Sequence, residues 1–173
     1  LAAKAVGPTG HVIGVDMTPT MIERARANAV KAELPNVEFR LGEIEHLPVA
    51  DSSVDLIISN CVVNLSPDKP QVFRDALRAL RPGGRLLVSD LVWNVAPPEA
   101  IRKSVDALVG CVAGASLKQE YLDLMRRAGF TDVTIVSESG YQAGLDALPE
   151  GSPDRAFYEQ VRSVKVRAHK PKA

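Results

Sequence analysis

The sequence is poor in several features whose scarcity excludes whole classes of protein. It has two cysteines in 173 residues, too few for a disulfide scaffold, so we expect a reducing compartment and a cytoplasmic protein. Its 21 basic and 21 acidic residues balance, and no general attraction to nucleic acid or to a membrane surface is expected. No apolar run is long enough to span a bilayer, and no signal peptide is visible.

The chain also lacks an initial methionine. It starts at Leu1, and residues 1–5 read as the last turns of a helix. We therefore expect an N-terminal segment to be missing. At the other end, residues 162–172 are basic, and we interpret them as an edge strand and a frayed end rather than a nucleic-acid patch.

Apolar runs alternate with amphipathic segments along the chain, which predicts βαβ units, a mostly parallel sheet and one α/β domain over residues 1–173. Predicted strands are 11–16, 37–41, 54–59, 85–92 and 131–138, and predicted helices are 67–80, 97–109 and 116–128. Thr18-Pro19-Thr20 opens a further helix, with a capping box from Thr20 to Glu23. Residues 163–169 alternate and are predicted to pair antiparallel with 131–138, while 140–153 read as a surface excursion.

Polar residues at the ends of predicted strands are the first functional signal, because open α/β sheets bind ligands at the carboxyl ends of their strands. Asp16 ends the first strand. A carboxylate there can accept two hydrogen bonds from a ribose diol, and Met17 can pack on an adenine ring. An equally supported alternative is that Asp16 accepts backbone N–H groups at the start of the next helix.

Two further strand ends carry similar residues. Gly42 allows close backbone approach, and Glu43-Ile44 follows it, so that Glu43 can reach an adenine amino group. Asn60 follows the strand 54–59. The alternatives are a solvated loop acid for Glu43 and a turn-forming residue for Asn60.

The order and spacing of these motifs carry a resemblance. Asp16, Gly42-Glu43, Asp55-Leu56-Ile57-Ile58 and the run Arg81-Pro82-Gly83-Gly84-Arg85-Leu86-Leu87-Val88 follow one another along the chain. From Val12 to about Phe130 the sequence resembles the class I S-adenosylmethionine-dependent methyltransferases. The resemblance implies a doubly wound, Rossmann-like methyltransferase fold with a reversed C-terminal hairpin and S-adenosylmethionine as cofactor. The family's first strand and glycine-rich loop would precede Leu1.

The two cysteines narrow the resemblance. Cys61 follows Asn60, and Cys111 lies in Gly110-Cys111-Val112-Ala113-Gly114-Ala115. With the run Glu43 to Val49, these stretches resemble the arsenite methyltransferases, which implies that Cys61 and Cys111 are the thiolates that hold As(III). The chemistry is consistent, since thiolates are soft ligands and the arsenic lone pair can attack a sulfonium methyl without a general base. We interpret His11, His46 and His169 as outside the reaction centre.

Two alternatives remain at this point. One is a methyltransferase of the same superfamily that acts on a quinone or sterol carbon, with incidental cysteines. The low aromatic content of 5% counts against it, because an aromatic pocket would be expected. The other is a thiol site that binds a metalloid without catalysis. In each case we expect a small-molecule ligand and a monomer.

Overall fold

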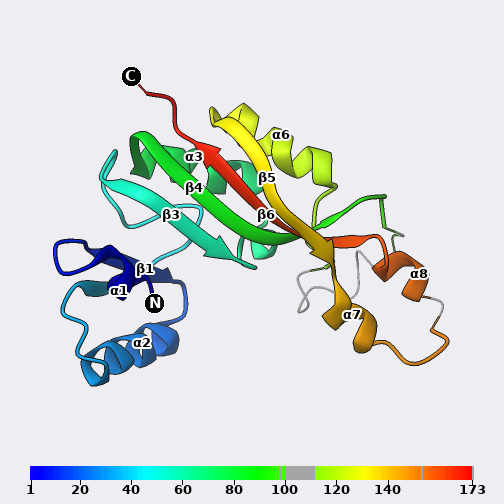
Figure 1. The fold of residues 1–173 in the computed structure, drawn as a ribbon, viewed down its shortest axis with the longest axis horizontal. Coiled ribbons are helices and arrows are strands. Elements are labelled where there is room, and N and C mark those ends of the chain that lie inside the picture. Colours follow the sequence, from blue (N-terminus) through cyan, green and yellow to red (C-terminus); the bar gives the residue numbers. More distant parts are fainter. Residues whose placement is uncertain (98, 100–111, 153, 173) are drawn as a thin grey trace. The chain divides into compact units, whose positions relative to one another are not determined.

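The computed structural model describes residues 1–97, 99, 112–152 and 154–172 (Figure 1). The predicted helix 97–109 and Cys111 therefore fall wholly or mostly outside the described residues. The contacts divide the chain into two compact units, residues 1–50 and 51–173. The single domain expected over the whole chain stays a prediction.

The first unit is a small parallel α/β layer. Its elements are α1 (Ala2–Val6), β1 (Val12–Asp16), α2 (Pro19–Lys31) and β2 (Val37–Leu41). β1 and β2 pair in parallel, with Val12 opposite Val37. Asn36 stabilises the unit, because its Nδ2 donates to the carbonyl oxygens of Ala3, Gly7 and Gly10 at 3.1, 2.9 and 3.2 Å. One amide thus joins the end of α1 to the entry of β2.

The predicted capping box of α2 is wrong. Thr18 is the N-cap and Pro19 the first helical residue, so Thr20 lies inside the helix. Proline suits the first helical position, because its fixed φ is already helical and no N–H is needed there. The backbone N–H of Thr18 instead donates to Asp16 Oδ1 at 2.8 Å.

The second unit contains a four-stranded sheet in the order β3-β4-β6-β5. Its elements are β3 (Val54–Asn60), the 3-10 turn η1 (Val63–Leu65), α3 (Lys69–Ala79), β4 (Leu80–Trp93), α6 (Lys118–Ala128), β5 (Thr131–Gly140), α7 (Gln142–Asp146), α8 (Arg155–Tyr158) and β6 (Val161–His169). β3 and β4 are parallel, whereas β6 runs antiparallel to both β4 and β5. The predicted reversed C-terminal hairpin is confirmed.

The core of this unit lies between its sheet and two helices. α3 and α6 pack together on one face of the sheet (Figure 1). Phe73 of α3 and Tyr121 of α6 are fully buried and meet edge to face, with ring centroids 5.5 Å apart. Val164, Val166 and Ala168 of β6 complete this layer. The alternation in β6 that predicted a strand therefore reflects one buried face.

β4 begins earlier than the sequence predicts. The turn residues Arg81–Gly84 form an irregularity inside the strand, since the register moves from Val54 opposite Leu80 to Leu56 opposite Arg85. Gly83 has a φ of 77°, and its N–H donates to the carbonyl oxygen of Lys170 at 3.1 Å. The C-terminal segment thus pairs with the turn and extends the strand.

None of the helices described here is both long enough and apolar enough to cross a membrane.

Candidate functional site

The carboxyl ends of β1 and β2 bring four of the predicted cofactor residues together. Asp16 lies opposite Leu41 in the parallel register, and the N–H of Gly42 donates to the backbone oxygen of Asp16 at 3.0 Å. Met17 is 71% exposed and Glu43 is exposed. Adjacent strands thus end in an exposed cluster of carboxylates and a thioether.

Asp16 accepts a backbone hydrogen bond near the start of α2, as the alternative interpretation predicted, and it still has an oxygen that could accept a hydrogen bond from a ligand. Its Oδ1 accepts the hydrogen bond from Thr18, and the side chain makes no other recorded hydrogen bond within the described residues. An exposed carboxylate with acceptor capacity remaining on Oδ2 fits a ribose diol, and exposed Met17 beside it fits the face of an adenine ring. The chemistry of this donor set therefore suits an adenosyl group.

Glycine is needed at position 42 because of a contact within the protein, with Pro48, and not only because a ligand could approach there. A Cβ at this position would lie 2.7 Å from Cδ and 2.8 Å from Cγ of Pro48. Arg40 Nη1 holds the same loop, since it donates to the carbonyl oxygen of Pro48 at 2.6 Å. The loop after β2 thus folds tightly against its own strand end, which fixes where Glu43 and Ile44 begin.

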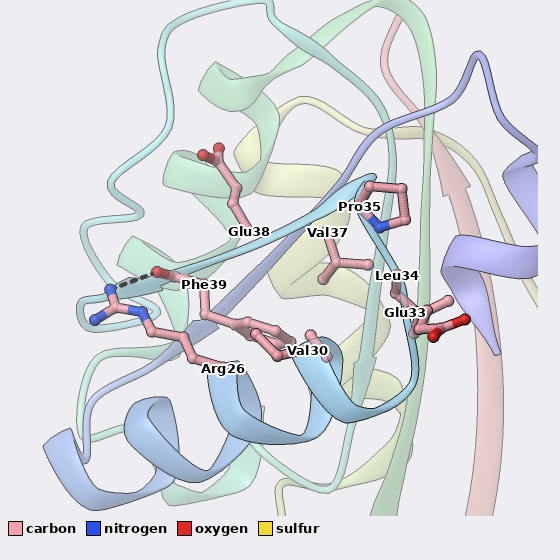
Figure 2. A pocket seen from close by; sticks show the side chains of 9 residues that line it. Arg26, Val30, Glu33, Leu34, Pro35, Val37, Glu38 and Phe39 are labelled. Atoms are coloured by element: carbon pink, nitrogen blue, oxygen red, sulfur yellow. Dashed lines mark hydrogen bonds between the residues drawn. The ribbon is translucent and has the colours of Figure 1, made fainter.

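A depression of about 720 Å³ lies elsewhere in the first unit, between α2 and β2 (Figure 2). It is open, and Val30, Leu34 and Phe39 supply apolar walls. Arg26 Nη2 donates to the backbone oxygen of Phe39 at 2.8 Å and so covers part of the strand edge. None of the predicted cofactor residues lines this depression, so its size does not make it the candidate site.

In the second unit, the chain turns sharply at the end of β3. Asn60 is exposed and pairs with Ser89 of β4, and the N–H of Cys61 then donates to the Ser89 oxygen at 2.8 Å. Cys61 has a φ of 54°, a left-handed conformation that costs a non-glycine residue about 1 kcal/mol. Strain at a strand end is typical of a functional position.

The side chain of Cys61 is half-buried against a small apolar cluster. The buried members of that cluster are Leu91, Trp93, Val112 and Val161. Cys111, the second predicted thiolate, lies outside the described residues, but it directly precedes Val112 in the chain. The structure therefore brings the immediate neighbour of Cys111 into the cluster that Cys61 contacts.

Asn64 is a candidate functional residue to which the sequence patterns assigned no role. It is 2% exposed, and its Nδ2 donates to the backbone oxygen of Leu91 at 2.7 Å. Its Oδ1 is also buried and has no hydrogen-bond partner among the described residues. A polar residue inside the apolar run Val62–Leu65 was the signal available, because buried amides need partners.

Asp90 is the second buried polar residue that sequence reasoning missed. It is 1% exposed, and its Oδ2 accepts a hydrogen bond of 2.7 Å from the hydroxyl of Tyr121. Burial raises the pKa of Asp90 to about 6, while the Tyr121 hydroxyl and the charge of Lys69 oppose this rise. Burial also raises the pKa of Tyr121, with smaller contributions from Asp90 and Cys61, so a charge at Cys61 is felt at this tyrosine.

The described residues offer no resident metal site. No group of three or more His, Cys, Asp or Glu side chains gathers in this part of the chain. His11 lies 3.5 Å from Glu38 at the start of β1, and His46 is exposed in the loop after β2. Neither histidine belongs to the Cys61 cluster.

The alternation of strands and helices, with polar groups at the strand ends, is that of a Rossmann-like α/β fold, a class whose members bind ligands at the carboxyl ends of their strands. The family model described as "Methyltransferase domain" matches residues 1–129, and the chain belongs to that family. The predicted fold is confirmed by the structure of an arsenic(III) S-adenosylmethionine methyltransferase from Chlamydomonas reinhardtii. That structure is similar with a TM-score of 0.80 and 35% identity over 99% of this chain and 58% of its own.

Curated relatives agree with the predicted resemblance. The arsenite methyltransferase of Halobacterium salinarum is 49% identical over 171 residues, which are 99% of this chain and 43% of the relative. That of Aquipseudomonas alcaligenes is 40% identical over 90% of this chain and 47% of the relative. A demethylmenaquinone methyltransferase of Lactococcus lactis is 32% identical over 84% of this chain and 60% of the relative. The chain spans less than half the length of the two arsenite methyltransferases.

Proposed function

We propose that this chain is the methyl-transfer part of an arsenite methyltransferase, in which Cys61 and Cys111 hold As(III) beside bound S-adenosylmethionine. The observation that carries the proposal is the strained Cys61 turn, whose side chain packs in one cluster with Val112, the neighbour of Cys111. The arsenite methyltransferases to which the chain is similar support it. The substrate is then a small molecule, arsenite or its thiol conjugate.

The strand ends of the first unit would hold the cofactor. Asp16 would accept hydrogen bonds from the ribose hydroxyls and Met17 would pack on the adenine ring, while Glu43, flanked by Gly42 and Ile44, would reach the adenine amino group. Asn60, at the end of β3, is a further residue that we assign to cofactor binding. When bound, S-adenosylmethionine supplies an electrophilic methyl group on a sulfonium.

The two thiolates orient the substrate for attack. Thiolate is the soft ligand that trivalent arsenic prefers, and only the deprotonated sulfur binds it. Held in this way by Cys61 and Cys111, arsenic would keep an unshared lone pair, which could accept the methyl group that S-adenosylmethionine would supply. The protein has to position the arsenite beside the methyl group and to exclude water, and no general base is needed.

The use of thiolates as ligands also favours a reducing compartment of the cell. Thiols stay reduced in the cytoplasm, where a cysteine pair remains available for arsenic. We therefore propose a cytoplasmic enzyme of arsenic detoxification.

A quinone-type carbon acceptor is the second candidate, favoured by the similarity to a demethylmenaquinone methyltransferase. Such an acceptor calls for an aromatic pocket. The chain has 5% aromatic residues, and Trp93, a member of the cluster that Cys61 packs against, is 1% exposed and so is not available to a ligand. The acceptor would leave the cysteines without a role.

The test compares single cysteine variants. The chain is incubated with S-adenosylmethionine, arsenite and a thiol reductant, and methylated arsenic is measured by chromatography with mass detection. Arsenite binding is measured in parallel, as protection of the thiols from alkylation. Cys61→Ser and Cys111→Ser should each abolish both signals. The control Val62→Ser changes an exposed neighbour in the same turn and should retain them. Equal signals in all variants would refute arsenic binding at these thiols.

A further inference from the structure

The segment that follows Cys111 is fastened to the end of β4 by Trp93. The indole Nε1 of Trp93 donates to the backbone oxygen of Val112 at 3.0 Å, and its backbone N–H donates to the oxygen of Ser116 at 2.9 Å. Trp93 also forms an isolated parallel bridge with Leu117. One buried residue thus holds both ends of residues 112–117.

The same segment rests directly on the turn that follows Cys61. A Cβ on Gly114 would lie 2.1 Å from the backbone oxygen of Asn64, so only glycine fits there without movement. Asn64 is itself fixed, because its Nδ2 donates to the oxygen of Leu91 in β4. The Cys61 turn and residues 112–117 therefore use one strand as a common frame.

We propose that Asn64, Trp93 and Gly114 are positioning residues, which set the distance between the Cys61 turn and the segment following Cys111 and so determine how tightly arsenite is bound. The proposal rests on the proposed function, since it concerns the two thiolates. None of the three residues needs to touch arsenic. They act by fixing the backbone positions of the two segments, because both segments are hydrogen-bonded to β4.

Gly114→Ala is the most direct perturbation. Real Cβ atoms essentially never approach within 3.0 Å of another atom, so the two backbones must separate by about 1 Å. Binding by two thiolates depends on their closing on one atom at a high effective concentration. We expect the affinity for arsenite to fall by at least about tenfold. The affinity of the chain for S-adenosylmethionine should not change.

Trp93→Phe provides a second perturbation that keeps an aromatic side chain. It removes the indole N–H and leaves the buried oxygen of Val112 without this donor, so arsenite affinity should again fall. The matched control is Phe73→Leu, which alters a fully buried aromatic residue in α3. The control should lower the free energy of unfolding and leave arsenite affinity at the wild-type value.

The experiment measures arsenite affinity by thiol protection in the wild type and in Cys61→Ser, Gly114→Ala, Trp93→Phe and Phe73→Leu, with urea unfolding for each. If arsenite binds the wild type but not Cys61→Ser, and both positioning variants bind as the wild type does, the positioning role is overturned and the proposed function stands. If Cys61→Ser binds as tightly as the wild type, the proposed function itself fails. Should Gly114→Ala not fold, the comparison of Trp93→Phe with Phe73→Leu decides.

Discussion

Replacement of Asp90 by Asn should stabilise the second unit at neutral pH. Asp90 lies in β4 with 1% exposure, and its carboxylate has one hydrogen-bonded oxygen and one buried oxygen without a partner among the described residues. Asparagine has nearly the same shape and can still accept the hydrogen bond from Tyr121. It carries no charge, so the variant removes the cost of burying a carboxylate.

The size of the effect follows from the pKa. Burial raises the pKa of Asp90 from the ordinary 3.8 to about 6, which makes its ionised form roughly 3 kcal/mol less favourable in the folded than in the unfolded chain. Lys69 makes the stabilisation expected from Asp90→Asn smaller than this value. Burial lowers the pKa of Lys69 while the charge of Asp90 opposes this, so the lysine loses a favourable neighbour in the variant.

The linkage between proton binding and folding determines whether the stability rises or falls with pH. Below the unfolded pKa both states of the chain carry the proton, and the raised pKa costs nothing. As the pH rises through about 4 to 6, the folded state binds more protons than the unfolded state, so its stability falls. The advantage of Asp90→Asn should therefore be near zero at about pH 3 and approach its full size at about pH 7.5.

Urea unfolding of both proteins at these two pH values is the assay. The matched control is Asp75→Asn, since Asp75 is also buried but its Oδ1 pairs with Arg78 Nε at 2.8 Å. That variant should destabilise the chain at neutral pH, because Arg78 loses a charged partner. An Asp90→Asn advantage that is absent at neutral pH, or equally large at acidic pH, would refute the reasoning.

Two further changes test the first unit. Asn36→Ala removes the amide that bonds three carbonyl oxygens, and it should destabilise residues 1–50 by roughly 1–3 kcal/mol; hydrogen exchange should accelerate there and stay unchanged in residues 51–173. Gly42→Ala places a methyl group 2.7 Å from Pro48 and should displace the loop that carries Glu43, so calorimetry should show weaker binding of S-adenosylmethionine. Gly140→Ala, where a Cβ meets nothing within 4 Å, is its control and should bind normally.

Sequence patterns predicted the elements whose side chains repeat regularly. β2 occupies the predicted residues Val37–Leu41, and β6 was recognised from its alternation because one face of the strand is buried. The ends of elements were harder to place. β4 includes the turn Arg81–Gly84 because Gly83 pairs with Lys170, a contact between residues far apart in the sequence.

Only the part of the candidate site that follows from the order of strands and helices could be predicted from the sequence. Asp16 and Gly42 meet because parallel strands end at one edge, which the order of elements implies. The roles of Asn64 and Asp90 depend on burial, and burial depends on which distant segment covers them. Tyr121, which is 31 residues from Asp90, supplies its hydrogen bond, and no local pattern in the sequence indicates such a pair.

In the proposed site, Cys61 and Cys111 present two sulfur ligands to one arsenic atom. Arsenic K-edge absorption spectroscopy of the arsenite-loaded chain measures this directly. We expect arsenic–sulfur coordination by both cysteines in the wild type, and no arsenic–sulfur signal in Cys61→Ser, which should not retain arsenite. A spectrum of arsenic bound only to oxygen, or one that Cys61→Ser leaves unchanged, would contradict this expectation.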